Sequence, residues 1–291
     1  MMLKETLTGF ADEISPDLNV QMDVLDSLDI HYIEMRGVDG RNLCDYSLEE
    51  ARTVKTRLCE RDFALSAVGS PIGKIKISDP FEPHFEKFCH ACDLAELFET
   101  PRIRIFSFYI PPEEDPASYR DEVLRRMSAM VDEAKRRGLV LLHENEKHIY
   151  GDTPERCLDL MQEFYGEHFQ ATFDPANFVQ CQVNVYPHAY DLLAPYIAYM
   201  HIKDAHLTDG TVTVAGRGDG GVKEVLSRLS EKNFEGFLSL EPHLTDFVGF
   251  KDLEQHAVEE VKEDAGMGAK LFAAAAGALR GLLEEIRKEG H

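Results

Sequence analysis

Four acid or histidine residues follow short apolar runs in the second half of the 291-residue chain. They are Glu144 after Leu141-Leu142-His143, Asp174 after Ala171-Thr172-Phe173, His201 after Tyr199-Met200, and Glu241 after Leu238-Ser239-Leu240. The intervals between them are 30, 27 and 40 residues, close to the length of one strand-plus-helix unit. In a closed parallel barrel the carboxyl ends of such strands meet. Like charges gathered there repel one another, so the pattern predicts a divalent metal ion between them.

The types of these residues narrow the choice of metal. Carboxylate oxygens with one imidazole suit Mn²⁺, Mg²⁺, Co²⁺ or Zn²⁺. No cysteine belongs to the set, which disfavours a structural zinc site. Glu146 points the same way as Glu144 if the strand continues, and it is an alternative for the first ligand. We therefore expect one divalent ion.

The elements that must position these residues alternate between short apolar runs and stretches with helical spacing. Alternating strands and helices predict a parallel sheet, and eight repeats predict a single (β/α)8 TIM barrel with an additional C-terminal helix. The first strand leads into Asp12-Glu13-Ile14-Ser15-Pro16, which lacks the glycines of a doubly wound nucleotide-binding fold. The predicted strands are Leu7–Ile14, His31–Met35, Ala64–Val68, Ile103–Phe108, Leu139–His143, Ala171–Asp174, Ile197–Ile202 and Gly236–Glu241.

Local signals support helices between these strands. Ser15-Pro16 and Thr153-Pro154 each place a capping hydroxyl before a proline, and Gly138 follows two arginines where a helix should end. We expect one domain over 1–291, with the barrel at about 7–245 and a C-terminal extension at about 246–291. The extension holds an acidic segment, 251–263, and a helix whose apolar stripe (Leu271, Ala275, Leu279, Leu282, Leu283, Ile286) should pack on the barrel.

Composition excludes several classes of function. The chain has 53 acidic and 31 basic residues, a formal charge of −22, which disfavours a nucleic-acid partner because such affinity depends on basic side chains. Neither a signal peptide nor a membrane-spanning run is apparent, so no membrane partner is expected. Six cysteines form no dense framework, and a cytoplasmic location with free thiols is expected. Cys89 and Cys92 lie in a helical pattern, which favours buried thiols over a redox pair.

Five segments around the strand ends carry a family likeness. They are Glu144-Asn145, Phe173-Asp174-Pro175-Ala176-Asn177, His201-Ile202-Lys203-Asp204, Gly216-Arg217-Gly218-Asp219 and Ser239-Leu240-Glu241-Pro242. With these segments the chain resembles the xylose isomerase-like TIM barrel superfamily, in the branch of sugar phosphate isomerases and epimerases, over about residues 7–245. The resemblance implies that Glu144, Asp174, His201 and Glu241 hold one divalent ion and that Glu144 and Glu241 also serve as the acid/base pair.

The chemistry of these residues leads to the same expectation. A metal chelated by a carbonyl and its neighbouring hydroxyl acidifies the adjacent C–H and stabilises an enediolate. Two carboxylates on opposite faces of the substrate can remove a proton and return it. Return at the same carbon gives epimerisation, and return at the adjacent carbon gives isomerisation. Loss of a β-hydroxyl would instead make the enzyme a dehydratase.

Five further residues are expected to bind substrate. Glu34 ends the second strand, where relatives often carry an acid, and Asn177 follows Asp174 by three residues. Lys203 and His206 flank the His201 strand end, and Arg217 lies in the seventh loop, where it could hold a hydroxyl or a carboxylate. That glycine-rich loop precedes a helix, but Asp219 would repel phosphate there, so the loop is interpreted as a turn.

The main hypothesis is a metal-dependent isomerase or epimerase acting on a sugar, keto-sugar or polyol. The alternatives are a dehydratase or other lyase on a keto-sugar or keto-inositol, an endonuclease IV-like repair enzyme, and a non-catalytic barrel. The endonuclease is disfavoured by the acidic charge and by the absence of histidines in Ala64–Val68 and Ile103–Phe108. The expected partner is a small carbohydrate, and the chain is a candidate for a homodimer or homotetramer.

Overall fold

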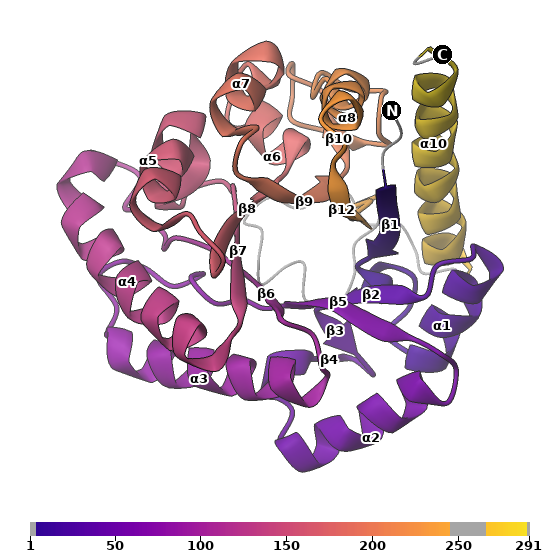
Figure 1. The fold of residues 1–291 in the computed structure, drawn as a ribbon, viewed down its shortest axis with the longest axis horizontal. Coiled ribbons are helices and arrows are strands. Elements are labelled where there is room, and N and C mark those ends of the chain that lie inside the picture. Colours follow the sequence, from indigo (N-terminus) through magenta and orange to yellow (C-terminus); the bar gives the residue numbers. More distant parts are fainter. Residues whose placement is uncertain (1–3, 245–265, 290–291) are drawn as a thin grey trace.

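Eight strands form one sheet that curls into a nearly closed barrel. The computed structural model describes residues 4–244 and 266–289. Within them the strand order is β1-β12-β9-β8-β7-β6-β5-β2, and the pairings are parallel. The two end strands of this order, β1 and β2, lie against each other. Figure 1 shows the strands around the centre and the helices outside them. The prediction of a (β/α)8 barrel is confirmed.

The bounds of the main elements follow the predicted alternation closely. The barrel strands are β1 (Lys4–Gly9), β2 (Tyr32–Met35), β5 (Ala64–Gly69), β6 (Arg102–Ile105), β7 (Val140–Glu144), β8 (Phe169–Phe173), β9 (Ile197–Ile202) and β12 (Glu235–Leu240). The helices are α1 (Leu18–Ser27), α2 (Leu48–Cys59), α3 (Phe81–Leu97), α4 (Arg120–Arg137), α5 (Pro154–Phe164), α6 (Pro175–Gln180), α7 (Tyr190–Leu193), α8 (Val222–Glu231) and α10 (Met267–Glu289). Two short hairpins, β3 (Gly37–Val38) with β4 (Arg41–Asn42) and β10 (Asp204–Ala205) with β11 (Val212–Thr213), lie in the loops.

The first strand is earlier than predicted. It ends at Gly9 instead of Ile14, and a 3₁₀ turn, Ala11–Glu13, follows. Ala11 and Ile14 are buried although they lie beyond the strand, so apolar character continues past its end and the sequence pattern overextends it. The cap of α1 also differs, because Asp17 rather than Ser15 accepts the first amides.

The C-terminal helix packs on the barrel, as expected. Helix α10 buries Phe272, Ala275, Ala276, Leu279, Leu283 and Ile286 and lies beside β1 (Figure 1). Gly9 permits this approach, because a Cβ there would lie 2.7 Å from the ring of Phe272. The acidic segment 251–263 lies outside the described residues. Among the described helices, none combines the length and hydropathy needed to cross a bilayer.

Three helix termini carry capping residues, and one of these residues belongs to the strand-end set. Thr153 caps α5 with Pro154 in its first turn, and Gly138 ends α4 in the left-handed conformation with a φ of 69°. Asp174 caps α6, with Pro175 following it. The strands that carry Glu144, Asp174, His201 and Glu241 are neighbours in the sheet, in the order β7, β8, β9, β12. The barrel therefore brings these four residues to one edge.

Candidate metal centre and active site

The four strand-end residues converge on one buried point. Glu144 ends β7, Asp174 follows β8, His201 lies near the end of β9 and Glu241 follows β12. One ligand atom from each lies within 4.8 Å of every other. All four are buried, from 0% exposed for Asp174 and His201 to 4% for Glu241. Glu146, the alternative first ligand, instead pairs with Lys74 at 3.0 Å.

His201 presents one ring nitrogen to the carboxylates. Its Nδ1 lies 3.0 Å from Oε1 of Glu144 and 3.3 Å from Oε2 of Glu241. Its Nε2 donates to Oε2 of Glu34 at 3.1 Å. Burial disfavours the imidazolium, but the surrounding carboxylates outweigh this and raise the pKa of His201 well above its usual range. Proton and metal ion therefore compete for Nδ1, since a metal binds only the neutral ring.

The cluster fits a divalent ion. Two of its buried atoms, Nδ1 of His201 and Oδ2 of Asp174, have no hydrogen-bond partner among the described residues. Donors held about 2.0–2.2 Å from one metal stand roughly 3.0–3.5 Å apart, and Nδ1 lies 3.0–3.6 Å from the three carboxylates. Three carboxylates with one imidazole form a donor set for Mg²⁺, Mn²⁺, Co²⁺ or Zn²⁺.

Neighbouring side chains fix the orientation of these ligands. Asp174 accepts a hydrogen bond from the backbone N–H of Asn177 through Oδ1 at 2.9 Å, which leaves Oδ2 facing the cluster. The Asn145 side chain bonds the backbone of Asp174 in both directions, at 2.9 and 2.8 Å. The side-chain amide of Asn177 donates a hydrogen bond to Oε1 of Glu144 at 3.1 Å. The structure thus places Asn177, expected to bind substrate, against a carboxylate of the cluster.

Glu34 also lies behind the cluster. Its side chain is fully buried, with hydrogen bonds from His201 and from Ser239, the latter at 2.7 Å. Burial opposes its ionisation, but His201 and Arg104 more than compensate and lower the pKa of Glu34. In these interactions Glu34 faces His201, and its ionised carboxylate selects which nitrogen of His201 carries the proton.

Lys203 is buried beside two of the acids. Its Nζ lies 2.9 Å from Oε2 of Glu241 and 3.1 Å from Oδ2 of Asp174. Burial opposes the charge on Glu241, yet Lys203 and the histidines hold the pKa of Glu241 well below its usual range. The lysine thus keeps Glu241 ionised and supplies part of the positive charge that the cluster requires.

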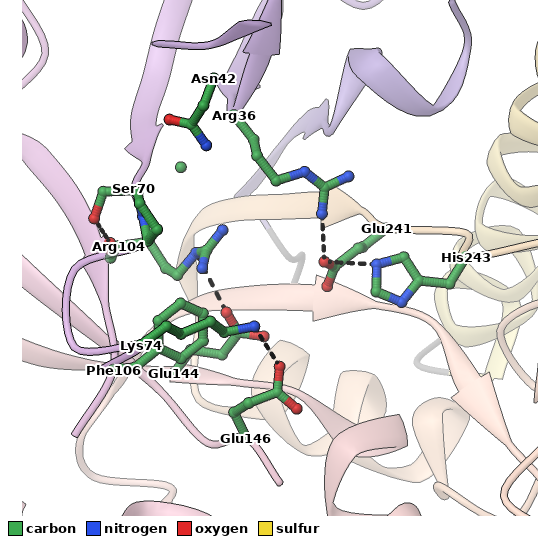
Figure 2. A pocket seen from close by; sticks show the side chains of 12 residues that line it. Arg36, Asn42, Ser70, Lys74, Arg104, Phe106, Glu144, Glu146, Glu241 and His243 are labelled. Carbon is green, nitrogen blue, oxygen red and sulfur yellow. Dashed lines mark hydrogen bonds and ion pairs between the residues drawn. The ribbon is translucent and has the colours of Figure 1, made fainter. Parts of the chain in front are cut away.

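A small pocket opens beside the cluster. Its volume is about 20 Å³, room for about one water, so a sugar-sized ligand must displace the long side chains around it. Figure 2 shows Glu144, Glu146, Glu241 and His243 facing Arg36, Lys74 and Arg104. Oε1 of Glu241 lies 3.3 Å from Nη1 of Arg36, and Oε2 of Glu144 lies 3.3 Å from Nε of Arg104. Each glutamate therefore has one oxygen in the cluster and the other beside an arginine.

Sequence reasoning missed the basic residues of this pocket. Arg36 directly follows β2, and Arg104 lies in β6 at alternate spacing with Arg102. His243, two residues after Glu241, places Nε2 at 3.0 Å from Oε1 of that glutamate. A basic residue at a strand end is as good a signal as an acid, so the same strand-end scan could have found Arg36 and Arg104.

Two residues expected to bind substrate lie elsewhere. Arg217 is exposed and borders a separate cavity of about 550 Å³ beside α10. His206 is partly exposed and is not among the residues that line the pocket beside the cluster. Asp204 accepts the amides of Gly216, Gly218 and Gly220 at 2.7–3.0 Å and so fixes the path of the seventh loop. The interpretation of that loop as a turn agrees with this geometry.

Comparison with known proteins identifies the family. A model described as "Xylose isomerase-like TIM barrel" matches residues 22–270. The chain belongs to this family. A search of curated protein sequences with this chain finds no match.

Several solved structures resemble the chain in fold at low sequence identity. An L-ribulose 3-epimerase is 14% identical, with a TM-score of 0.77 over 99% of this chain and 97% of its own. A probable 3-DHS dehydratase from Bacillus anthracis is 16% identical, with a TM-score of 0.70 over 94% and 98%. A barrel protein from Mycobacterium smegmatis in complex with magnesium is 17% identical, with a TM-score of 0.65 over 97% and 98%. At such identities these likenesses show the fold alone.

Proposed function

We propose that the protein is a divalent-metal-dependent isomerase or epimerase of a sugar, keto-sugar or polyol. The observation that carries this proposal is the convergence of Glu144, Asp174, His201 and Glu241 within 4.8 Å. The named epimerases among the structural neighbours, for L-ribulose and D-psicose, are consistent with it. An ion bound by the four residues would polarise a carbonyl and acidify the C–H beside it.

Glu144 and Glu241 are the proposed acid/base pair. Glu144 comes from β7 and Glu241 from β12, so the two carboxylates approach the pocket from different strands. Each turns one oxygen toward the pocket wall, where Arg104 or Arg36 lies 3.3 Å away. Lys203 and the neighbouring histidines keep Glu241 ionised, as a base requires. One glutamate would take the proton from carbon, and the other would deliver a proton to the opposite face or the adjacent carbon.

Lys203 and Asn177 support this proton transfer. Lys203 holds Oε2 of Glu241 at 2.9 Å, and Asn177 holds Oε1 of Glu144 at 3.1 Å. Both contacts fix a carboxylate whose position decides which proton it reaches. We therefore assign these two residues, with Glu34, to positioning. Substrate contact by His206 or Arg217 is no part of the proposal.

A dehydratase on the same residues is the second candidate. The dehydratase among the structural neighbours favours it, since loss of a β-hydroxyl from an enediolate needs the same base. Its product would be lighter than the substrate by one water, whereas an isomer or epimer has the same mass.

Hydrogen exchange in D₂O tests the proposal. Metal-loaded protein is incubated with a panel of ketoses, keto-acids and keto-inositols, and carbon-bound deuterium is followed by NMR and mass spectrometry. Exchange that Glu144→Gln and Glu241→Gln abolish, and that the exposed Glu49→Gln leaves intact, is the expected result. Metal binding without exchange or water loss on any compound would overturn the assignment.

A further inference from the structure

The pocket beside the cluster has two walls of opposite charge. Glu144, Glu146 and Glu241 come from the second half of the barrel, whereas Arg36, Lys74 and Arg104 come from the first half. In Figure 2 the guanidinium groups of Arg36 and Arg104 enter the same space, although β5 lies between β2 and β6 in the sheet. A neutral sugar needs amides, hydroxyls and carboxylates to hold its hydroxyl groups, and buried cations are a costly way to do so. Binding of a neutral sugar therefore does not explain the basic wall formed by Arg36, Lys74 and Arg104.

The guanidinium of Arg36 pairs with three buried or nearly buried carboxylates. Its Nε lies 2.8 Å from Oδ2 of Asp12, and its two Nη atoms lie 3.3 Å from Glu13 and Glu241. These contacts join the loop after β1 to the end of β2 and hold Glu241. Arg36 is therefore a positioning residue for Glu241.

Arg104 is placed differently. It is only 4% exposed, and its ion pairs to Glu144 and Glu34 run through Nε, at 3.3 and 3.6 Å. Its guanidinium carbon lies 4.4 Å from the centre of the Phe106 ring, so the group packs against an aromatic surface. Nε has no hydrogen-bond partner among the described residues. The other end of the guanidinium borders the pocket, where it can receive a further acceptor.

Lys74 extends this basic surface. Its Nζ lies 3.0 Å from Oε2 of Glu146 and 4.3 Å from the centre of the same Phe106 ring. Asn42 and Ser70 border the pocket on the same side. A guanidinium fork with an ammonium beside it matches the two oxygens of a carboxylate. Phosphate, with nearly two negative charges, would lie close to Glu144 and Glu146 and suits this wall less well.

We propose that the substrate is an acid, a polyhydroxylated keto compound whose carboxylate binds Arg104 and Lys74 across the pocket from the metal cluster. The inference rests on the proposed function for the place of the reacting carbonyl. It narrows the substrate class from sugars and polyols in general to their carboxylated members.

Binding measurements that compare a neutral ketose with its carboxylated counterpart test the proposed substrate class without requiring turnover. Isothermal titration calorimetry with Mn²⁺-loaded protein compares a ketohexose, the keto acid that carries a carboxylate in place of its terminal hydroxymethyl group, and the phosphorylated ketohexose. The keto acid should bind about tenfold to hundredfold more tightly than the neutral ketose. Arg104→Gln should remove this preference, and Arg104→Lys should retain part of it. The exposed Arg217→Gln serves as the matched control and should keep the full preference.

Clear outcomes would overturn the inference. It fails if the neutral or the phosphorylated ligand binds as tightly as the keto acid, or if Arg104→Gln leaves the ratio unchanged. Should Arg104→Gln not fold, Lys74→Met carries the test, and the inference fails if that variant keeps the full ratio. Acid-selective binding without exchange or water loss would remove the proposed function alone. Exchange on neutral ketoses without acid selectivity would remove this inference alone.

Discussion

Glu34 accepts a hydrogen bond from Nε2 of His201 at 3.1 Å, and this bond turns Nδ1 toward the three carboxylates of the cluster. The two residues come from β2 and β9, which are not neighbours in the sheet, so the contact crosses the barrel interior. A carboxylate behind a histidine ligand fixes the tautomer of the ring and raises its basicity. Glu34 thereby orients His201 within the candidate metal centre without contributing a ligand to it.

Glu34→Gln should weaken divalent metal binding. The amide carries no charge and can donate a hydrogen bond to Nε2, which would place the proton on Nδ1. We expect the affinity for Mn²⁺ to fall about tenfold to hundredfold, as measured by competition with a fluorescent chelator. Glu49→Gln, on the exposed first turn of α2, is the control. An unchanged Mn²⁺ affinity in Glu34→Gln would refute the positioning role.

Removal of metal should abolish exchange reversibly. The protein treated with a chelator should show no deuterium incorporation, and Mn²⁺ or Mg²⁺ should restore it. At saturating metal, Glu144→Gln and Glu241→Gln should each lower the exchange rate about 10²- to 10⁴-fold. Metal content measured on the same samples separates lost chemistry from lost metal. Exchange that persists in metal-free protein would contradict the mechanism.

Asn177→Asp should shift the pH dependence of the reaction. The Asn177 amide lies 3.1 Å from Oε1 of Glu144, so a carboxylate in its place puts a like charge beside the proposed base. A nearby negative charge raises the pKa of a carboxyl group, and the acidic limb of the kcat/KM profile should move to higher pH. Asn19→Asp, exposed on α1, should leave the profile in place. A shift of the acidic limb to lower pH, or no shift, would contradict the role assigned to Asn177.

The pair formed by Glu146 and Lys74 should stabilise the fold in a pH-dependent way. Burial opposes the charge on Glu146, but Lys74 and neighbouring lysines lower its pKa to about 2. A depressed carboxyl pKa contributes stability above the unfolded value of about 4.3, and that stability is lost as the pH falls toward 2. Glu146→Gln should therefore destabilise the protein at pH 6 and progressively less below pH 4.5. Urea unfolding across this range measures it, and a constant difference between the two proteins would contradict the assignment.

The sequence predicts the acids of the site because their strands end at regular intervals. The register of the barrel then decides which side chains meet, and this lies beyond a single-sequence pattern. Arg102 and Arg104 alternate with isoleucines in β6, yet Arg104 borders the pocket while Arg102 lies over the ring of Phe237. The two arginines share one face of β6 and differ in height along the barrel, because Arg102 begins the strand and Arg104 lies one residue before its end.

The position of Arg217 depends on the backbone path of its loop. Arg217 follows the β10–β11 hairpin, and its loop is held by the bonds from three glycine amides to Asp204. A Cβ at Gly218 would lie 2.4 Å from the carbonyl oxygen of Ala205, so the loop packs closely against β10. Such contacts depend on backbone geometry that residue types alone do not specify.

The division of the pocket into two walls has a consequence for how the protein can evolve. Glu144, Asp174, His201 and Glu241 come from β7 onward, whereas Arg36, Lys74 and Arg104 lie at or before β6. Substitutions in the first half of the chain can therefore change the basic wall while the acidic cluster of the second half stays the same. In a barrel arranged this way, ligand specificity and the metal-binding residues can evolve separately.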